Sequence, residues 1–323
     1  MISRFGAGPM VVWLVISSYR NDSDILRILD QVHQFDQKFF SAILVVDSEG
    51  TGVIPAAILQ YGWSDVIYRS YDYNLGSGAN LSERLRIAAQ AGADFAYALN
   101  HDGNFAPAVF TALLNTASSI QNLGAAYPLS LLASRGAYNI TGTRELPLSA
   151  KLIPTPPAQS LLDVFWSSSN GALYSMAPVR QGILPWPELW MAWEDLEYGW
   201  RLLDAGYRQV IVTEALYRDN YEYRQSWIGS TVDKPPWRTY FNFRNLLLAI
   251  RRTRPRPLFY AVAAYRLMLE IALIVLIRNH KLERLRFLLK GFMQGISEAI
   301  DLSGDIVPAK PFKPFCAPQS ADL

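Results

Sequence analysis

The chain has 323 residues, of which 50% are apolar and 13% aromatic, and its formal net charge is +2. This length and composition argue against a disordered chain and allow one large domain, alone or with an appendage. The single cysteine, Cys316, rules out an intramolecular disulfide framework and a cysteine-based zinc site, and it fits a reducing compartment. The apolar run at 11–16 is too short for a signal peptide, so we expect a cytoplasmic protein.

The charges are unevenly distributed along the chain. Between Arg244 and Lys290 there are eleven Lys or Arg and two Glu, a local charge of +9 that leaves −7 for the remainder. We therefore predict two regions. The first is an acidic α/β domain over 1–230, and the second is a basic helical region over 231–323 that ends in a Pro-rich tail.

The first part of the chain predicts strands that alternate with helices. Its helices are expected between the strands, one ending near Phe40 and another over 81–90. Polar residues follow the carboxyl ends of the strands, where ligands bind in a doubly wound α/β sheet, and this is the fold that the alternation predicts. The apolar, β-branched runs that predict buried strands are 11–16, 42–46, 65–69 and 95–99.

The middle of the chain is less regular. A helix is expected over 108–121, and 125–127 and 146–153 are candidates for paired outlying strands around a loop at 134–144. Residues 163–175 predict a strand interrupted by a turn of small residues. A last short strand is expected over 209–213.

An amphipathic helix is predicted after Pro187, with its end near Gly206. Glu197 and Arg201 lie four residues apart in it and can pair along its surface. Its apolar stripe consists of Trp193, Leu196, Trp200 and Leu203.

Glu194 and Asp195 fall in the first turn of this helix. The helix dipole favours carboxylates there and would keep them ionised at neutral pH. An ionised carboxylate suits a general base that takes a proton from a hydroxyl. The same pattern fits two ordinary N-terminal residues of an amphipathic helix, and alone it does not decide between these interpretations.

Two polar turns could bind phosphates. Asn100 and Asp102 follow a predicted strand and offer oxygen ligands for a divalent cation on a diphosphate, although such residues are common in turns. The segment Asn74–Asn80 has glycines before a helix, which could bring backbone amides up to a phosphate. It lacks the third glycine of the dinucleotide fingerprint, and no Walker pattern occurs, which argues against a dehydrogenase and a P-loop NTPase.

Together these segments resemble the nucleotide-sugar glycosyltransferases of family 2. Asn74–Asn80 is similar to that family's glycine and asparagine loop, and Leu99–Asp102 to its metal-binding Asp-x-Asp turn. Trp193–Arg201 is similar to its acidic catalytic helix, in the form that galactofuranosyl and rhamnosyl transferases carry. The resemblance spans about residues 11–245 and implies a GT-A fold, a doubly wound mixed sheet with a C-terminal helical extension.

The resemblance implies a role for each acidic landmark residue. Asp195 would be the base that deprotonates the acceptor hydroxyl, and Glu194 would help to hold the acceptor. Asp102 would bind a divalent metal, Mn²⁺ or Mg²⁺, that bridges the donor diphosphate, with Asn100 beside it. Asp47 would meet the ribose or the base of the nucleotide.

Further residues are implied to contact the two substrates. Tyr19 would lie against the nucleotide base. Trp190 and Trp193 could stack on a sugar ring of the acceptor, although a tryptophan at helical spacing more often packs in the core. The remaining donor contacts are expected from Ser17, Asn74, Gly76, Asn80 and Ser169.

The implied reaction is a transfer with inversion, because one base on the acceptor side and positive charge on the leaving diphosphate suffice. UDP-galactofuranose and dTDP-rhamnose are the leading donors, and the acceptor would be a saccharide or a lipid-linked saccharide for a cell-surface polysaccharide. We expect no nucleic-acid partner, and a homo-oligomer is left open.

Two departures from the family pattern motivate an alternative. Asn100 stands where the family has its first Asp, and no His follows the acidic helix, where Arg218 or Asp219 could substitute. A catalytically silent nucleotide-sugar-binding or assembly subunit would tolerate both changes. A nucleotidyltransferase fits less well, because it needs a Gly-rich basic loop where this chain has 17–21.

The apolar segment 258–277 in the basic region has the length that crosses a bilayer. Arg266 and Glu270 lie one turn apart in its middle and argue against a spanning helix. An amphipathic helix is the better prediction, either packed on its own domain or lying in the interface of an anionic membrane. The second arrangement would place the protein on the inner face of the plasma membrane.

Overall fold

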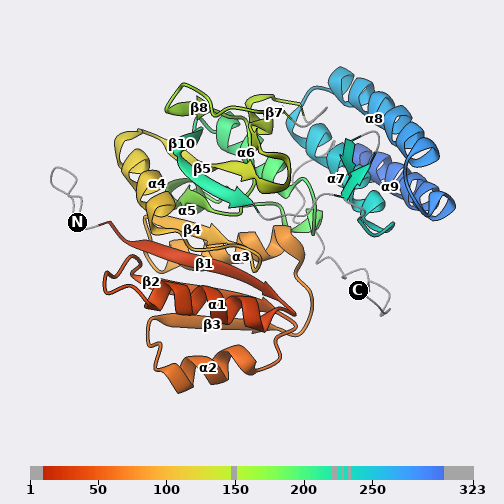
Figure 1. The fold of residues 1–323 in the computed structure, drawn as a ribbon. Coiled ribbons are helices and arrows are strands. Elements are labelled where there is room, and N and C mark those ends of the chain that lie inside the picture. Colours follow the sequence, from red (N-terminus) through yellow and green to blue (C-terminus); the bar gives the residue numbers. More distant parts are fainter. Residues whose placement is uncertain (1–9, 147–150, 220–223, 227–228, 232–233, 302–323) are drawn as a thin grey trace.

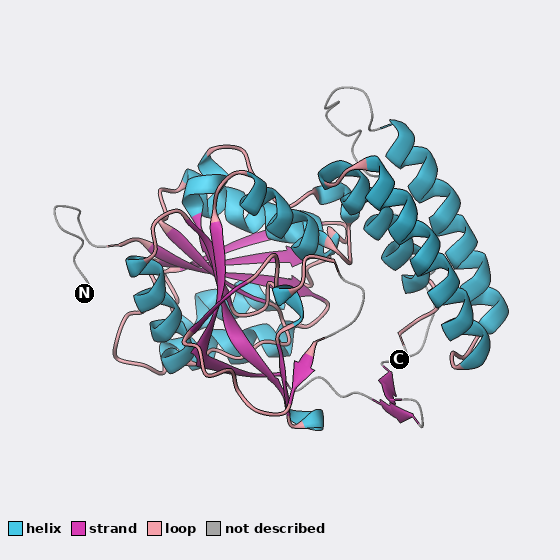
Figure 2. Ribbon diagram, turned by 90° about the horizontal axis from the view of Figure 1, so that it is seen from above, coloured by secondary structure: helices cyan, strands magenta, loops and turns pink. Residues whose placement is uncertain are grey.

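The computed structural model describes residues 10–146, 151–219, 224–226, 229–231 and 234–301. Within these ranges a sheet with helices on both sides is joined to a group of long C-terminal helices (Figures 1 and 2). The predicted doubly wound mixed α/β sheet is therefore confirmed. Part of the strand expected over 146–153, and all of the tail that holds Cys316, lie outside the described residues.

The main sheet has the strand order β3-β2-β1-β4-β9-β5-β10-β8. The first four strands of this order are parallel, β9 runs antiparallel to β4 and β5, and β10 is parallel to β5. Strand β8 is antiparallel to β10. The bounds are β1 Val12–Tyr19, β2 Ala42–Ser48, β3 Val66–Tyr71, β4 Phe95–Leu99, β5 Leu123–Leu132, β8 Leu161–Asp163, β9 Ala172–Ser175 and β10 Arg208–Asp219.

Shorter strands lie off this path. Strand β6, Ala137–Asn139, pairs with β5 and with β7, Leu152–Ile153. A separate two-stranded sheet is formed by β11, Arg224–Ser226, and β12, Gly229–Thr231. The described part of the outlying strand predicted near 146–153 therefore pairs with β6 rather than with β5.

Helices cover both faces of the main sheet. The two apolar cores show that α1, α2 and α4 pack on one face and α3, α5 and α6 on the other. Alternation along β1 fills both cores, since Leu14 and Ile16 face one and Trp13 and Val15 the other. The bounds are α1 Asp22–His33, α2 Val53–Tyr61, α3 Gly76–Gln90, α4 Pro107–Ser119, α5 Met176–Arg180 and α6 Glu194–Asp204, with 3₁₀ turns at η1 Ala133–Arg135, η2 Thr141–Thr143 and η3 Pro187–Leu189.

Several predicted bounds were wrong. Helix α1 ends at His33 rather than near Phe40, because Phe39 and Phe40 pack into an aromatic cluster with Phe105 and Phe110. The sequence analysis also missed α2. Its Pro55 is compatible with a helix, because a proline in the first turn removes no hydrogen bond.

Three more segments differ from their predictions. Helix α3 begins at Gly76, so most of the loop expected before residue 81 is the first turn of that helix. The interrupted strand predicted over 163–175 is two strands, β8 and β9, on opposite sides of β5 and β10. Strand β10 continues to Asp219, beyond the predicted end at 213, because it pairs with β5 almost throughout.

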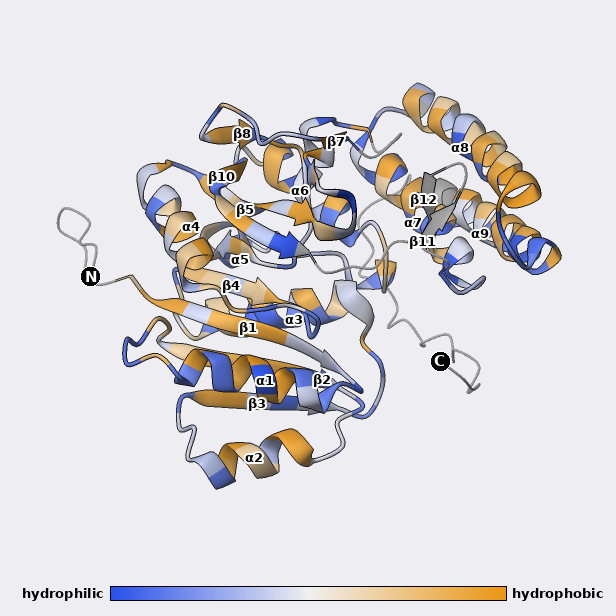
Figure 3. Ribbon diagram, viewed as in Figure 1, coloured by the Kyte–Doolittle hydropathy of each residue, from blue (hydrophilic) through white to orange (hydrophobic). Residues whose placement is uncertain are grey.

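The C-terminal helices are α7 Arg238–Thr253, α8 Arg256–Leu276 and α9 Lys281–Asp301. They share one apolar core with α6, since Leu196 and Trp200 pack among Leu247, Phe259 and Leu288. Helix α8 lies outermost and carries hydrophobic residues along its length (Figure 3). The basic region is therefore a part of the structure that supports α6.

Residues 257–276 of α8 are long and apolar enough to cross a membrane, and 22% of this stretch is buried in the protein. Arg266 and Glu270 form an ion pair at 3.6 Å, and their side chains are 13% and 14% exposed. The charges therefore lie on the inner side of α8, where Phe259 and Ile274 are also buried, and further apolar residues are exposed on the outer side. Helix α8 thus packs on its own protein, one of the two arrangements expected, but its exposed side is apolar and not polar.

The backbone and the surroundings of Gly76 explain why α3 begins with a glycine. Its φ is +70°, and an added Cβ would lie 2.2 Å from the carbonyl oxygen of Trp190. We predict that Gly76→Ala lowers the free energy of unfolding by about 2–4 kcal/mol, from overpacking and from the left-handed backbone together. Urea unfolding measures the loss.

Gly62→Ala is the matched control for this prediction. Gly62 has φ +66° but nothing within 4 Å of an added Cβ, so only the backbone cost of about 1–2 kcal/mol is expected. Equal losses in the two variants would contradict the packing explanation for Gly76.

Candidate active site

The carboxyl ends of β1, β2 and β4 meet at one edge of the sheet. Ile16 pairs with Leu99, and Ser18 pairs with Asp47. The hydroxyl of Ser17 donates to the side-chain oxygen of Asn100 at 3.3 Å. Ser17, Asp47 and Asn100 are therefore brought together as predicted, at the edge where α/β sheets bind ligands.

A turn before β9 completes this edge. The backbone N–H of Asn100 donates to the side-chain oxygen of Asn170 at 3.0 Å, and the N–H of Gly171 donates to Ala98 O at 2.8 Å. The amide of Asn170 also donates to the hydroxyl of Tyr217 from β10. The turn that holds Ser169 and Asn170 is thus fixed against the predicted metal-binding turn.

Glu194 and Asp195 begin α6, directly after Trp193, which has a left-handed backbone with φ +69°. Burial raises the pKa of Asp195 well above its ordinary value of 3.8, and the charge of Glu194 raises it further. Hydrogen bonds with Ser169 and the charge of Arg84 lower this pKa. Burial likewise raises the pKa of Glu194.

Burial therefore opposes the ionised state that the sequence analysis expected of both carboxyls. The helix dipole acts on them as expected, but the cost of removing adjacent carboxylates from water is larger. One oxygen of each, Asp195 Oδ1 and Glu194 Oε2, is buried without a hydrogen-bond partner among the described residues. A buried oxygen without a partner is a place where a substrate hydroxyl can donate.

Adjacent residues connect the two halves of the candidate site. Ser169 lies close enough to Asp195 to lower its pKa, and Asn170 accepts from the backbone of Asn100. The acidic helix and the predicted metal turn therefore lie on either side of one short turn. The sequence analysis named Ser169 but missed Asn170, whose position next to it was the available signal.

Arg84 of α3 is a second residue that the sequence analysis missed. It is only 1% exposed, and its guanidinium donates to the carbonyl oxygens of Val15 and Leu99 at 3.0 and 3.1 Å. Burial lowers its pKa to about 10, while the charges of Tyr174 and Asp195 oppose this shift. A positive charge is thus fixed beneath the site. Its position within the apolar face of α3, between Leu81 and Ala88, was the signal.

Asp47 and Tyr19 lie at the far end of this edge. Asp47 is 1% exposed, and one oxygen accepts from the hydroxyl of Tyr68 at 2.7 Å. Its other oxygen, Oδ1, is buried without a partner among the described residues. Tyr19 is half-buried, with the guanidinium of Arg20 5.3 Å from its ring centre. Asp47 therefore keeps an acceptor free for a ligand.

The segment Asn74–Asn80 makes structural contacts in the described protein. Gly76 and Gly78 allow the start of α3 to lie against the backbone of Trp190, which accepts from Gly78 N at 3.1 Å. The side chain of Asn74 caps Gly76 N, and the amide of Asn80 donates to Val46 O. The glycines are thus used for helix packing rather than displayed in a loop.

The two tryptophans predicted to meet the acceptor lie in different surroundings. Trp190 is 5% exposed, packs on Trp237 and Phe241, and donates its ring N–H to Asn74 O. This burial corrects its predicted role as a stacking surface. Trp193 is half-buried and borders a cavity, with its ring N–H donated to Asn242 O at 2.7 Å.

Helix α7 holds the segment that leads into the carboxylates. Asn245 is fully buried and donates to the carbonyl oxygens of Leu189 and Met191, while Arg244 donates to Glu188 O. Trp190, Ala192 and Trp193 have positive φ in this segment, a backbone that such side chains adopt at a cost. Contacts from α7 therefore fix the position at which α6 begins.

Glu197 and Arg201 form the predicted ion pair. The carboxylate of Glu197 is fully buried, however, so the pair does not lie along the surface as expected. The apolar stripe differs from its prediction, because Leu202 is fully buried in place of Leu203. Helix α6 packs on two sides. Tyr198 and Leu202 face the sheet, and Leu196 and Trp200 face the C-terminal helices.

Asp102 is exposed at the end of the sheet, and Asn100 lies beside it. A carboxylate and an amide oxygen are donors that Mn²⁺ and Mg²⁺ accept, and diphosphate oxygens complete such sites, so the residues fit this metal. The described residues contain no cluster of three or more His, Cys, Asp or Glu that could hold a metal ion. Any metal here would depend on ligands from a substrate.

No protein-family model matches the chain, and no curated protein matches its sequence. Among solved structures, S. aureus TarS 1-349 is similar with a TM-score of 0.55 and 13% identity over 91% of this chain and 83% of that one. Its complex with UDP-GlcNAc gives a TM-score of 0.55 and 15% identity at the same coverage. The mannosyltransferase PcManGT from Pyrobaculum calidifontis, in complex with GDP-Man and Mn²⁺, gives a TM-score of 0.50 and 12% identity. The likeness covers 94% of this chain and 80% of that one.

These likenesses confirm the predicted GT-A-like fold, because glycosyltransferases with the same arrangement of strands and helices cover most of this chain. Identities of 12–15% show the fold alone.

The buried carboxylates generate a prediction about stability. The pKa of Asp195 is raised in the folded protein, so its folding penalty is absent below the ordinary value of 3.8 and grows as pH rises toward the raised pKa. We therefore expect Asp195→Asn to raise the free energy of unfolding at pH 8 by about 1–3 kcal/mol. Denaturant unfolding across pH measures this difference.

Asp102→Asn is the matched control, because Asp102 is exposed. It should change the free energy of unfolding by less than about 0.5 kcal/mol at either pH. The explanation fails if Asp195→Asn is no more stable than the wild type at pH 8. It also fails if the difference in free energy of unfolding is as large near pH 3.8, the ordinary pKa of the carboxyl, as at pH 8.

Proposed function

We propose that this protein is an inverting, metal-dependent glycosyltransferase that moves a sugar from a nucleotide-diphosphate donor to a saccharide or lipid-linked acceptor. The observation that carries the proposal is the turn at Ser169 and Asn170, which joins the Asn100 turn to the carboxyl of Asp195. The fold shared with TarS and PcManGT, solved with UDP-GlcNAc and GDP-Man, supports a nucleotide sugar as the donor.

Asp195 accepts the proton of the acceptor hydroxyl while that oxygen attacks the anomeric carbon and the bond from this carbon to the diphosphate breaks. Its raised pKa makes it a stronger base than an ordinary carboxylate, which favours proton transfer near neutral pH. Glu194 holds the acceptor beside it. A single displacement without a carboxylate nucleophile inverts the anomeric centre.

Asp102 and Asn100 would hold the divalent metal, Mn²⁺ or Mg²⁺, with the donor diphosphate. The metal supplies positive charge to the leaving group. Arg84 holds a charge beneath Asp195 and ties together the ends of β1 and β4. These residues position the two reacting groups in one crevice.

The nucleotide would lie along the edge from Ser17 to Asp47. The free Oδ1 of Asp47 accepts from the ribose or base, and Tyr19 lies against the base. UDP-galactofuranose and dTDP-rhamnose are the proposed donors, for a cell-surface polysaccharide made in the cytoplasm at the inner face of the plasma membrane. A catalytically silent binding subunit is the second candidate, favoured by Asn100 and by the lack of a described three-residue metal cluster.

Transfer assays separate the two candidates. With Mn²⁺ and a panel of nucleotide sugars, the wild type should transfer sugar or hydrolyse its donor, and Asp195→Asn should lower the rate by about 10²–10⁴-fold. Donor binding should persist in that variant. Wild-type binding without turnover for any donor and acceptor would instead support the silent subunit.

The pH dependence of transfer tests the role of Asp195. Activity needs the unprotonated base, so kcat/KM should rise with pH through an apparent pKa above 3.8 that belongs to the Glu194 and Asp195 pair. Arg84→Met should move this limb to higher pH, because it removes a charge that lowers the pKa of Asp195.

Two variants control this experiment. Arg84→Lys keeps the charge and should return the apparent pKa of kcat/KM most of the way to its wild-type value. Arg86→Met removes an exposed partner of Glu83 on the same helix and should leave this apparent pKa unchanged. A limb that stays at the ordinary carboxyl pKa in every variant would exclude Asp195 as the base.

A further inference from the structure

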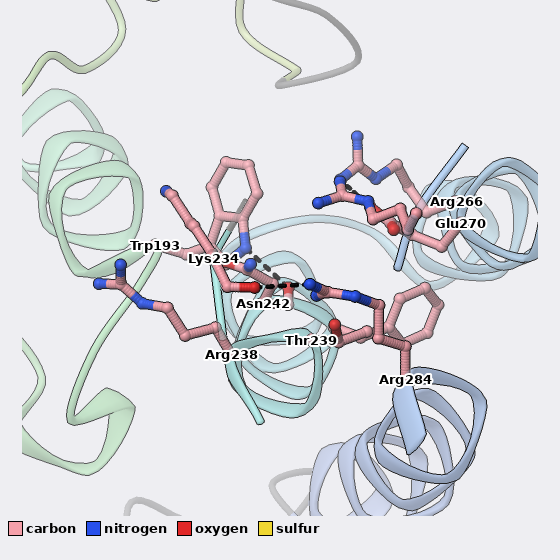
Figure 4. Close-up of a pocket in the computed structure, with 10 residues that line it drawn as sticks. Trp193, Lys234, Arg238, Thr239, Asn242, Arg266, Glu270 and Arg284 are labelled. Carbon is pink, nitrogen blue, oxygen red and sulfur yellow. Dashed lines mark hydrogen bonds and ion pairs between the residues drawn. The ribbon is translucent and has the colours of Figure 1, made fainter. Parts of the chain in front are cut away.

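A cavity of about 330 Å³ lies beside the start of α6. The proposed reaction gives it no role. Figure 4 shows that side chains from α7, α8 and α9 converge on it next to Trp193. Five cationic side chains and one carboxylate line it: Lys234, Arg238, Arg266, Arg278, Arg284 and Glu270.

Among the described residues that line the cavity, Glu270 is the one carboxylate. Glu270 pairs with Arg266, and Arg284, which is 1% exposed, donates to the carbonyl oxygens of Asn279 and Lys234. Lys234, Arg238 and Arg278 form no ion pair with any residue that the structure describes. Such a concentration of partly buried positive charge is costly unless an anion enters it.

The cations also act on one another. Burial lowers the pKa of Lys234, and the nearby charges of Arg238 and Arg278 lower it further. Burial lowers the pKa of Arg266, and Arg278 contributes in the same direction. A bound phosphate would relieve this repulsion, since its oxygens accept charge-assisted hydrogen bonds from Arg and Lys.

The cavity lies near Glu194, the residue proposed to hold the acceptor. The pKa of Glu194 is raised by burial, and among the opposing influences are the charges of Arg238 and Lys234. Trp193, which borders the cavity, directly precedes Glu194. The proposed donor diphosphate lies instead at Asp102, at the sheet edge. The cavity is therefore suited to an anion on the acceptor.

Helix α8 indicates what carries that anion. Arg266 and Glu270 face the cavity, while the opposite face of α8 exposes apolar side chains. A helix with its side chains is about 10–12 Å thick, so a membrane against the apolar face would lie near the cavity. The large hydrophobic residues that α8 exposes are Tyr260, Tyr265, Met268, Ile271, Val275 and Leu276.

We propose that this cavity binds the phosphate or diphosphate group of a lipid-linked acceptor and thereby presents the acceptor's sugar to Asp195. The inference rests on the proposed function, because it names the class of acceptor for that reaction. Trp193 lies between the phosphate and the base, where it can contact the first sugar.

Calorimetric titration of the full-length protein tests this assignment, with farnesyl diphosphate in detergent as the probe. Farnesol and inorganic pyrophosphate are the comparison ligands. We expect the diphosphate lipid to bind more tightly than either. Arg238→Gln and Arg278→Gln should each weaken its binding about tenfold or more, the effect of losing one charge-assisted contact.

Arg286→Gln is the matched control, because it removes the same charge from an exposed position on α9 that does not line the cavity. It should leave the affinity within about twofold. Arg278 lies in the turn after α8, so its variant retains the fold even if Arg238→Gln does not.

Three results would overturn the proposal. Pyrophosphate binding as tightly as farnesyl diphosphate would indicate a soluble anion, and farnesol binding as tightly would exclude a phosphate site. Equal weakening of UDP or dTDP binding with Mn²⁺ in the cavity variants would assign the cavity to the donor. Failure of these nucleotides to bind the wild type would count against the proposed function alone, while the lipid and variant pattern would still support the cavity assignment.

Discussion

The burial of two adjacent carboxylates at the start of α6 is the constraint on which the site depends. Burial raises the pKa of both Glu194 and Asp195, and the charge of Glu194 raises that of Asp195 further, so holding them there lowers the stability of the folded protein. Ser169 and the positive charge of Arg84 offset part of this cost. A site that retains such a cost is typical of groups that must donate or accept protons.

The remainder of the fold fixes where these carboxylates lie. Asn245 binds the carbonyl oxygens of the strained segment before α6, and α7 to α9 share a core with the outer face of α6. The basic region thus supports the site mechanically and contributes the cations of the cavity beside it. The domain boundary near residue 230 stays a prediction. Helix α6 packs against elements that precede this boundary and against elements that follow it.

Sequence patterns predicted the strands of the first half because runs such as 42–46 are apolar on both faces and bounded by polar turns. They also placed Ser17, Asp47 and Asn100 at one edge, because parallel strands end together. The roles of Arg84 and Asn245 could not be predicted in the same way, because they depend on contacts distant in the sequence. Arg84 binds carbonyl oxygens 15 and 69 residues away. Asn245 binds carbonyl oxygens 54 and 56 residues away. The raised pKa of Asp195 was not predicted, because a helix N-terminus is visible in the sequence, whereas depth of burial is set by packing.

The most direct test of the account is a crystal structure with Mn²⁺ and the nucleotide sugar that binds, with the metal located by its anomalous scattering. The account predicts Mn²⁺ bound to the Asp102 carboxylate at about 2.2 Å, and the anomeric carbon of the donor facing Asp195 across an open crevice. A nucleotide bound elsewhere, or packed side chains separating Asp102 from Asp195, would contradict it.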